Sequence, residues 1–162
     1  MSSMKITIIS VGKIKEAFYR DAIAEYSKRL SAYCKLTVRE VTDEKTPDNA
    51  SDEMERQIRE KEGERILKVL DERGYSIALA INGTKYDSVG FAGHLDKLAI
   101  SGKSHIQFVI GGSLGLSETV LSKADEKISF SDMTFPHQLM RVILLEQIYR
   151  GFRINHHEPY HK

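Results

Sequence analysis

The sequence predicts an α/β fold in which a mostly parallel sheet is covered by helices on both faces. Short apolar runs alternate along the chain with longer segments of helical periodicity, which is typical of parallel strands joined by helical crossovers. Some of these runs are apolar nearly throughout, as expected of strands that are buried on both sides.

Strands are expected at residues 5–12, 36–41, 75–83, 105–110 and 127–131. The runs KITIISVG and YSIALAING each end at a glycine and predict deeply buried strands. The strand near Val38 is expected to be half-buried, because Lys35, Thr37 and Arg39 alternate with its apolar residues.

Helices are expected at residues 14–33, 51–70, 88–98, 117–124 and 136–152. Ser51, Ser88 and Ser117 are the expected N-caps, and Pro136 is expected to begin the last helix. The helical periodicity includes apolar residues close to the helix starts, namely Phe18, Met54 and Val89. The polar stretch at residues 43–53 is the best candidate for a mobile loop.

The chain of 162 residues fits one domain, which we assign to residues 4–162. Residues 1–3 precede a second methionine and are a candidate cloning remnant. With 41% hydrophobic and 29% charged residues, the composition is ordinary for a globular protein, and no signal peptide or membrane span is expected. The single cysteine, Cys34, suits a reducing cytoplasm and a structural role.

The net charge of +1 neither indicates nor excludes a nucleic-acid partner. The distribution of charge is more informative, because four of the six histidines lie in the last 26 residues together with three arginines and Lys162. The C-terminal end is therefore locally basic.

The last helix is apolar nearly all the way round, from Leu139 to Tyr149. One sheet covers only one face of a helix, so the other face requires a second partner. We therefore expect a homodimer with this helix near the two-fold axis.

A glycine-rich stretch, FVIGGSLGLS at residues 108–117, follows the fourth strand. It lacks the lysine of a P-loop, and its first two glycines are adjacent, which breaks the dinucleotide-binding spacing. A tight turn explains it without a ligand. Its place beyond the carboxyl end of a strand nevertheless favours a small-molecule site.

Two further loops, at residues 79–83 and 130–137, leave carboxyl ends of neighbouring strands. The three loops are rich in backbone polar groups and apolar side chains. That combination fits a neutral or cationic adenosine-type ligand better than a polyphosphate.

The sequence closely resembles the bacterial ribosomal RNA large subunit methyltransferase H family of the SPOUT class. The resemblance runs from about Met4 to Lys162. The residues that carry it are Leu79–Gly83, Ile110–Gly115, Phe130–Gln138, Arg141, Glu146–Arg150 and Glu158–Lys162. Their order and spacing make the combination far more specific than any one motif.

The resemblance implies a single-domain α/β knot, in which the C-terminal segment threads through a loop and shapes a pocket for S-adenosyl-L-methionine. It implies a homodimer that methylates N3 of a pseudouridine in 23S ribosomal RNA of assembled ribosomes. The cofactor-binding residues that it implies are Leu79, Gly111, Gly112, Phe130, Ser131, Asp132, Met133, Thr134 and Phe135.

Methyl transfer to a ring nitrogen requires that the nitrogen be oriented and lose its proton, so a general base or an electrostatic aid is expected. The sequence does not identify this group. The catalytic candidates are His137, Arg141, Arg150, His157 and His161. Arg141 and Arg150 lie nine residues apart, on opposite sides of the helix. One arginine could serve the pocket of its own subunit while the other reaches across the dimer; the alternative is that both are solvated or pair with Glu146.

The tail from Asn155 to Lys162 allows three interpretations. A metal site is disfavoured, because the His-His-Glu run lacks helical ligand spacing and Pro159 breaks a helix. A flexible tail is the plain alternative. With the family resemblance, a tail that contacts RNA or closes a pocket is favoured, and the RNA-binding candidates are Arg150, Arg153, Tyr160, His161 and Lys162.

An RNA methyltransferase is the leading hypothesis for the function. The alternatives are an enzyme that binds nucleotide phosphates through the glycine-rich turn and an inactive ribosome-associated protein of the same fold.

Overall fold

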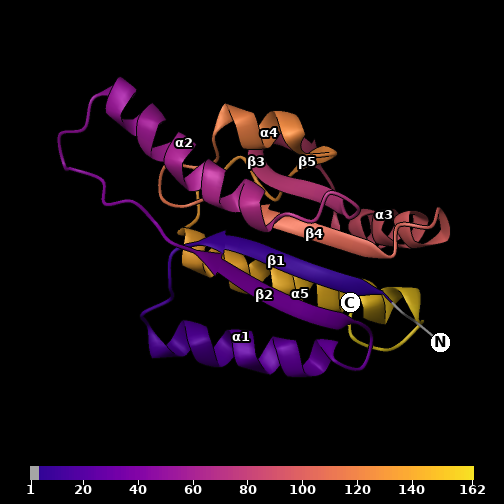
Figure 1. Cartoon of the computed structure of the whole chain (residues 1–162). Helices are drawn as coiled ribbons and strands as arrows, with labels where there is room; N and C mark the ends of the chain where they lie inside the picture. The colour runs from indigo at the N-terminus through magenta and orange to yellow at the C-terminus, as the bar shows by residue number, and fades with distance from the viewer. Residues whose placement is uncertain (1–3) are drawn as a thin grey trace.

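A computed structural model describes residues 4–162, and the candidate cloning remnant at residues 1–3 lies outside it. Its strands pair in the order β2-β1-β4-β3-β5, and every pairing between these strands is parallel (Figure 1). The strands are β1 (Lys5–Val11), β2 (Lys35–Val41), β3 (Tyr75–Lys85), β4 (His105–Ile110) and β5 (Glu126–Ser129). The helices are α1 (Ala17–Leu30), α2 (Asp52–Val69), α3 (Ser88–Ile100), α4 (Glu118–Lys123) and α5 (His137–Asn155). The predicted fold class is confirmed.

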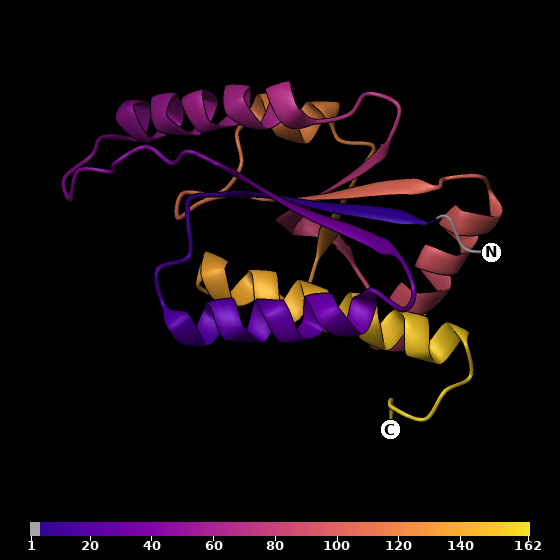
Figure 2. The same cartoon turned by 60° about the horizontal axis from the view of Figure 1, so that its bottom comes forward.

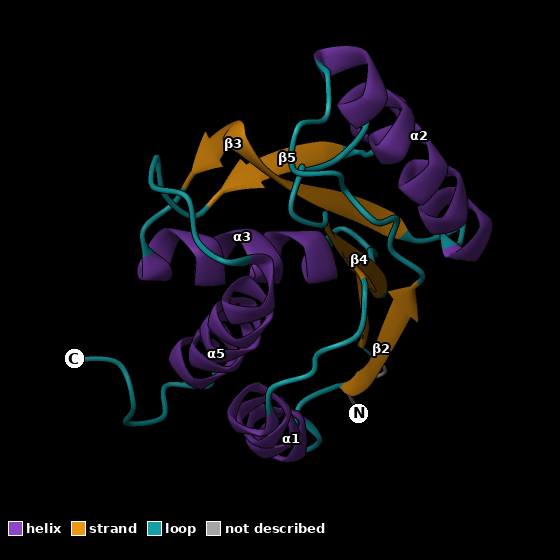
Figure 3. Cartoon of the chain, turned by 90° about the vertical axis from the view of Figure 1, so that its left-hand side faces the viewer, coloured by secondary structure: helices purple, strands orange, loops and turns teal. Residues whose placement is uncertain are grey.

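The helices divide between the two faces of the sheet. Helices α1, α3 and α5 lie together on one face, and α2 packs with α4 on the other (Figures 2 and 3). Alternate residues of the central strands serve the two cores: Ile8 and Phe108 face the first group, whereas Ile9 and Val109 face α2 and α4. This two-sided burial explains why β1 and β4 are apolar nearly throughout, with Thr7, Ser10 and Gln107 as buried polar exceptions.

Strand β2 forms one edge of the sheet and is less buried than the expected alternation suggests. Val41 is buried, but Val38 is 39% exposed. The charged residues that it carries, Lys35, Arg39 and Glu40, are typical of an edge that must not pair with another sheet.

Two of the three predicted serine caps are confirmed. Ser51 Oγ accepts a hydrogen bond from the Met54 amide at 3.1 Å, and Ser117 Oγ accepts one from the Val120 amide at 3.2 Å. The prediction for Ser88 is wrong, because Asp87 caps α3 by accepting from the Gly90 amide at 2.7 Å.

Three residues assigned to apolar helix faces are exposed. Phe18, Met54 and Val89 are 64%, 43% and 54% exposed, respectively. Each lies in the first turn of its helix. The first turn of α2 extends past the body of the sheet (Figure 1). Helical periodicity alone therefore overstates burial at helix starts.

Helix α5 lies between α1 and α3 and runs three residues beyond the predicted end at Phe152. Leu144, Leu145 and Ile148 are buried within the chain, so the flanking helices cover part of the surface that the dimer prediction left to a second copy. Leu139, Val142 and Ile143 stay only partly buried. The homodimer therefore remains a prediction, and it concerns a narrower surface.

The contact between α2 and α4 depends on a glycine. A Cβ atom at Gly63 would overlap the capping hydroxyl of Ser117 and approach Val120 Cγ2 to 3.1 Å. We expect Gly63→Ala to lower the free energy of unfolding by about 1–3 kcal/mol, because overpacking and a displaced cap outweigh the gain in helix propensity. Denaturant unfolding measures this change.

Gly93→Ala in α3 is the matched control, because no heavy atom lies within 4 Å of the added Cβ. It should raise stability by about 0.5–1 kcal/mol through helix propensity alone. Equal effects of the two substitutions would contradict the close contact.

Candidate active site

A cavity of about 900 Å³ lies at the carboxyl edge of the sheet, where β3, β4 and β5 end. All three loops predicted from the sequence line it. Eight of the nine predicted cofactor-binding residues are among its lining residues: Leu79, Gly111, Gly112, Phe130, Ser131, Met133, Thr134 and Phe135. The exception is Asp132, whose carboxylate instead pairs with Lys85 at the end of β3.

The part of β3 that lines the cavity departs from regular pairing. The register with β5 shifts between Leu79 and Thr84, so the residues between them leave the ladder. Gly83 permits this path, because a Cβ atom there would lie 2.6 Å from the Ile128 carbonyl carbon. The loop therefore offers backbone groups and the side chains of Ile81 and Asn82 to the cavity.

The glycine-rich stretch forms a tight turn, stabilised by a hydrogen bond of 3.0 Å from the Gly115 amide to the Gly112 carbonyl. Gly115 has a φ of +83°, which only glycine adopts without strain. A Cβ atom at Gly111 would lie 2.6 Å from the backbone of Gly115. Gly111 is thus required by the turn itself, before any ligand is considered.

His137 lines the cavity and is the first residue of α5. Burial lowers the pKa of its imidazole, and the positive charge of Arg141 lowers it further, while Asp43 and Glu16 oppose the shift. The ring is therefore neutral at pH 7 and able to accept a proton. Of the five catalytic candidates, it is the one that lines the cavity.

Arg141, one turn further along α5, is only 2% exposed. Its guanidinium donates to Glu40 at 2.7 Å and to the carbonyl oxygens of Val11 and Gly12 at 2.8 and 2.7 Å. Burial lowers its pKa, and the hydrogen bond to Glu40 opposes that effect. These contacts tie α5 to the ends of β1 and β2, and Arg141 does not line the cavity.

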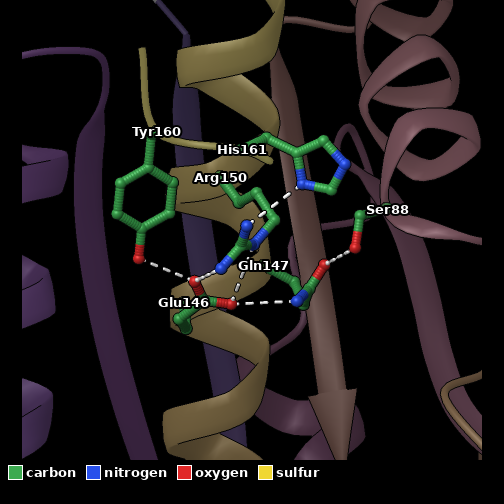
Figure 4. A network of polar contacts seen from close by, with 6 residues as sticks. All are labelled: Ser88, Glu146, Gln147, Arg150, Tyr160 and His161. Atoms are coloured by element: carbon green, nitrogen blue, oxygen red, sulfur yellow. Dashed lines mark hydrogen bonds and ion pairs between the residues drawn. The ribbon is translucent and has the colours of Figure 1, made fainter.

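The C-terminal tail is held against the far half of α5 by a polar network (Figure 4). Tyr160 donates to Glu146 at 2.7 Å, and Arg150 pairs with the same carboxylate at 2.8 Å. Arg150 also lies 3.1 Å from His161 Nδ1 and 4.7 Å from the Tyr160 ring centroid. Burial and the Glu146 carboxylate raise the pKa of Tyr160 to about 12, so its phenol stays protonated.

A second set of contacts fixes the start of the tail. Tyr33 donates to Glu158 at 2.6 Å, and Arg153 donates to the Pro159 carbonyl at 3.1 Å. Glu146 lies nine residues beyond His137 on the same helix, which corresponds to about 14 Å along its axis. No residue of the tail lines the cavity of the described chain.

Comparison with known proteins agrees with this architecture. A family model described as "Predicted SPOUT methyltransferase" matches residues 4–161. The chain belongs to the SPOUT methyltransferase family.

This SPOUT methyltransferase has curated relatives that it matches over their whole length. It is 62% identical to the Ribosomal RNA large subunit methyltransferase H of Bifidobacterium adolescentis over 159 residues, which are 98% of this chain and 100% of that protein. It is 60% identical to the protein of the same name from Clostridium tetani and 61% identical to the one from Clostridium botulinum, with the same coverage.

The structure also bears on three further points from the sequence: metal sites, membrane spans and Cys34. Among residues 4–162, no group of three or more His, Cys, Asp or Glu side chains converges as a metal site would require. None of the described helices is long and apolar enough to span a membrane. Burial raises the pKa of Cys34 to about 11, which keeps this thiol protonated and unreactive.

Sequence reasoning did not find every residue that lines the cavity. Arg59 reaches it from α2 and Met140 from α5, both outside the three loops. The helical register of α5 places Met140 three residues after His137, and this spacing could have indicated it. No local signal marks Arg59, because its place depends on how α2 crosses the sheet.

The contacts of Arg141 predict a structural role. We expect Arg141→Met to lower the free energy of unfolding by about 3 kcal/mol, because Glu40 and two carbonyl oxygens lose their donor. Arg150→Met, which breaks a partly exposed pair, should cost about 1 kcal/mol or less. Urea unfolding of both variants checks this, and a larger loss for Arg150→Met would contradict it.

Proposed function

We propose that this protein transfers a methyl group from S-adenosyl-L-methionine to N3 of a pseudouridine in 23S ribosomal RNA, on assembled ribosomes in the cytoplasm. The single observation that carries the proposal is the cavity that the three loops surround at the carboxyl edge of the sheet. Family membership and the names of the full-length relatives support the reaction type and the RNA substrate.

The residues around the cavity fit this methyl donor. Leu79, Phe130 and Met133 offer apolar walls for an adenine ring, and the turn at Gly111–Gly115 offers backbone groups for hydrogen bonds. The glycine-rich turn carries no lysine or arginine that would favour a polyphosphate. When bound, S-adenosyl-L-methionine supplies an electrophilic methyl group, so the acceptor nitrogen gains a methyl group and loses a proton.

We assign His137 as the general base that accepts the proton from the acceptor nitrogen. Its imidazole is neutral at pH 7, and it lines the cavity that would hold the methyl donor. Arg141 contributes indirectly, because its positive charge helps keep the imidazole unprotonated.

The active unit in this proposal is a homodimer. The tail and the cavity lie at opposite ends of α5, so one chain does not bring its own RNA-binding candidates to its own cavity. A second copy packed on Leu139 and Val142 of α5, which line neither of the two cavities, would place one tail near the other cavity. The knotted path implied by the family resemblance would fix the loops around the cavity.

Two measurements test the function as a whole. Titration calorimetry should detect binding of S-adenosyl-L-methionine and not of ATP, and mass mapping should locate one added methyl group on 23S RNA after incubation with unmethylated ribosomes. Binding of ATP alone would favour a nucleotide-phosphate enzyme. Ribosome binding without methylation would favour an inactive ribosome-associated protein.

The pKa direction of His137 gives a further prediction. A lowered pKa keeps the ring neutral as the pH falls, so the methylation rate should decline only below the ordinary histidine pKa of about 6.5. We expect His137→Gln to reduce the single-turnover rate about 100-fold and to remove this acidic limb.

The control is His105→Gln. His105 is the first residue of β4, so it lies at the amino end of that strand, away from the cavity at the carboxyl ends. Burial also lowers the pKa of His105, but it does not line the cavity. The His105→Gln enzyme should keep the wild-type pH profile. An unchanged profile in His137→Gln would remove His137 as the base.

A further inference from the structure

A second cavity, of about 360 Å³, adjoins the one described above. Ile128, Ser129, Phe130 and Phe135 line both cavities, so the two cavities meet along a common border. Six further residues line only the second cavity. Four lie at or just before the start of α3, namely Tyr86, Asp87, Ser88 and Phe91, and two lie on α5, namely Ile143 and Gln147. None of these six residues belongs to the predicted cofactor site.

The polar groups of the second cavity are held in fixed positions. Ser88 donates to Gln147 Oε1 at 2.8 Å, and Gln147 Nε2 donates to Glu146 at 2.9 Å (Figure 4). Glu146 is the carboxylate that also holds Arg150 and Tyr160. The second cavity is thus connected through Gln147 to the residues that are candidates for RNA binding.

Asp87 provides an acceptor at this site. Its Oδ1 atom caps α3 through the Gly90 amide, which fixes the carboxylate. No group of residues 4–162 is hydrogen-bonded to its Oδ2 atom. A capped carboxylate therefore presents one free oxygen beside aromatic walls, which is a suitable arrangement for an N–H group on a flat ring.

We propose that the second cavity receives the acceptor base and that Asp87 Oδ2 accepts the N1–H group of pseudouridine. This inference rests on the proposed function. With N3 directed across the common border toward the methyl donor in the first cavity, the N1–H bond of the same ring points in a different direction. It then faces the residues that line only the second cavity. Phe130, Phe135 and Tyr86 offer apolar or stacking surfaces for a base.

This assignment explains how the enzyme would distinguish pseudouridine from uridine. In pseudouridine the sugar is attached to carbon, so N1 carries a hydrogen, whereas in uridine N1 is bonded to the sugar and has none. A carboxylate would accept a charge-assisted hydrogen bond from this N–H group, and uridine could not form that bond. The expected preference in kcat/KM for pseudouridine over uridine is about 10- to 100-fold, which corresponds to roughly 1.5–3 kcal/mol. It is not larger because Asp87 is exposed in the chain.

The test uses Asp87→Asn and two pools of ribosomes that carry either pseudouridine or uridine at the acceptor position. Asparagine caps a helix as well as aspartate does, so the fold should be unaffected. Its amide would turn an N–H donor toward N1–H when its oxygen caps α3. We expect kcat/KM on pseudouridine ribosomes to fall 10- to 100-fold, with little change on uridine ribosomes and unchanged affinity for S-adenosyl-L-methionine.

Asp96→Asn is the matched control, an exposed carboxylate on the same helix outside both cavities. It should keep the wild-type preference. If Asp87→Asn keeps the wild-type ratio of kcat/KM on pseudouridine ribosomes to kcat/KM on uridine ribosomes, the role of Asp87 is overturned. An equal loss of kcat/KM on both ribosome pools would overturn it too. A wild-type enzyme that methylates neither pool would overturn the proposed function and this inference with it.

Discussion

The guanidinium of Arg141 joins three elements at the carboxyl edge of the sheet. It lies on α5, its acceptors are the last carbonyl groups of β1 and Gly12, and its counter-ion is Glu40 of β2. A buried cation is tolerated where a counter-ion and hydrogen-bond acceptors surround it, and here three contacts hold the guanidinium while its Nε has no partner among the described residues. The start of α5 is therefore fixed relative to the strand ends, and with it the loop at residues 130–136 and His137.

The other wall of the cavity depends on backbone packing rather than charge. Gly111 and Gly115 close a turn that admits no side chain at the first position, and Gly83 lets β3 leave its ladder beside Ile128. These glycines show why a stretch that looks like a phosphate loop need not bind phosphate. Their first requirement is steric, and the resulting cavity is lined mainly by apolar side chains and backbone groups.

Much of this fold follows from patterns that are local in the sequence. The buried strands β1 and β4 are apolar nearly throughout. Ser51 and Ser117 each cap a helix that begins at the next residue. The three cavity loops were predictable, because carboxyl ends of parallel strands meet at one edge. The long-range partners were not. Ser88 does not cap its helix because Asp87 does, while its hydroxyl is bound to Gln147, 59 residues away.

The same limit applies to the functional candidates. Arg141 and Arg150 are both arginines of one helix, and their spacing correctly places them on different sides. It could not show that Arg141 binds carbonyl groups 130 and 129 residues away, or that Arg150 organises Tyr160 and His161. Asp87 and Gln147 raised no expectation at all, because a capping aspartate and a helical glutamine are common. Their interest comes only from the cavity that they share.

Helix α5 connects both cavities and the C-terminal tail. Its first turn borders the cavity through His137 and Met140, its middle borders the second cavity through Ile143 and Gln147, and its last half holds the tail through Glu146 and Arg150. A rigid helix keeps these three regions at constant separation, which is the requirement for placing a flexible RNA strand against a small methyl donor. A helix that carries binding groups along its whole length must keep apolar residues between them for packing. This explains why α5 appears apolar all the way round in sequence and yet retains partly buried positions in the folded chain.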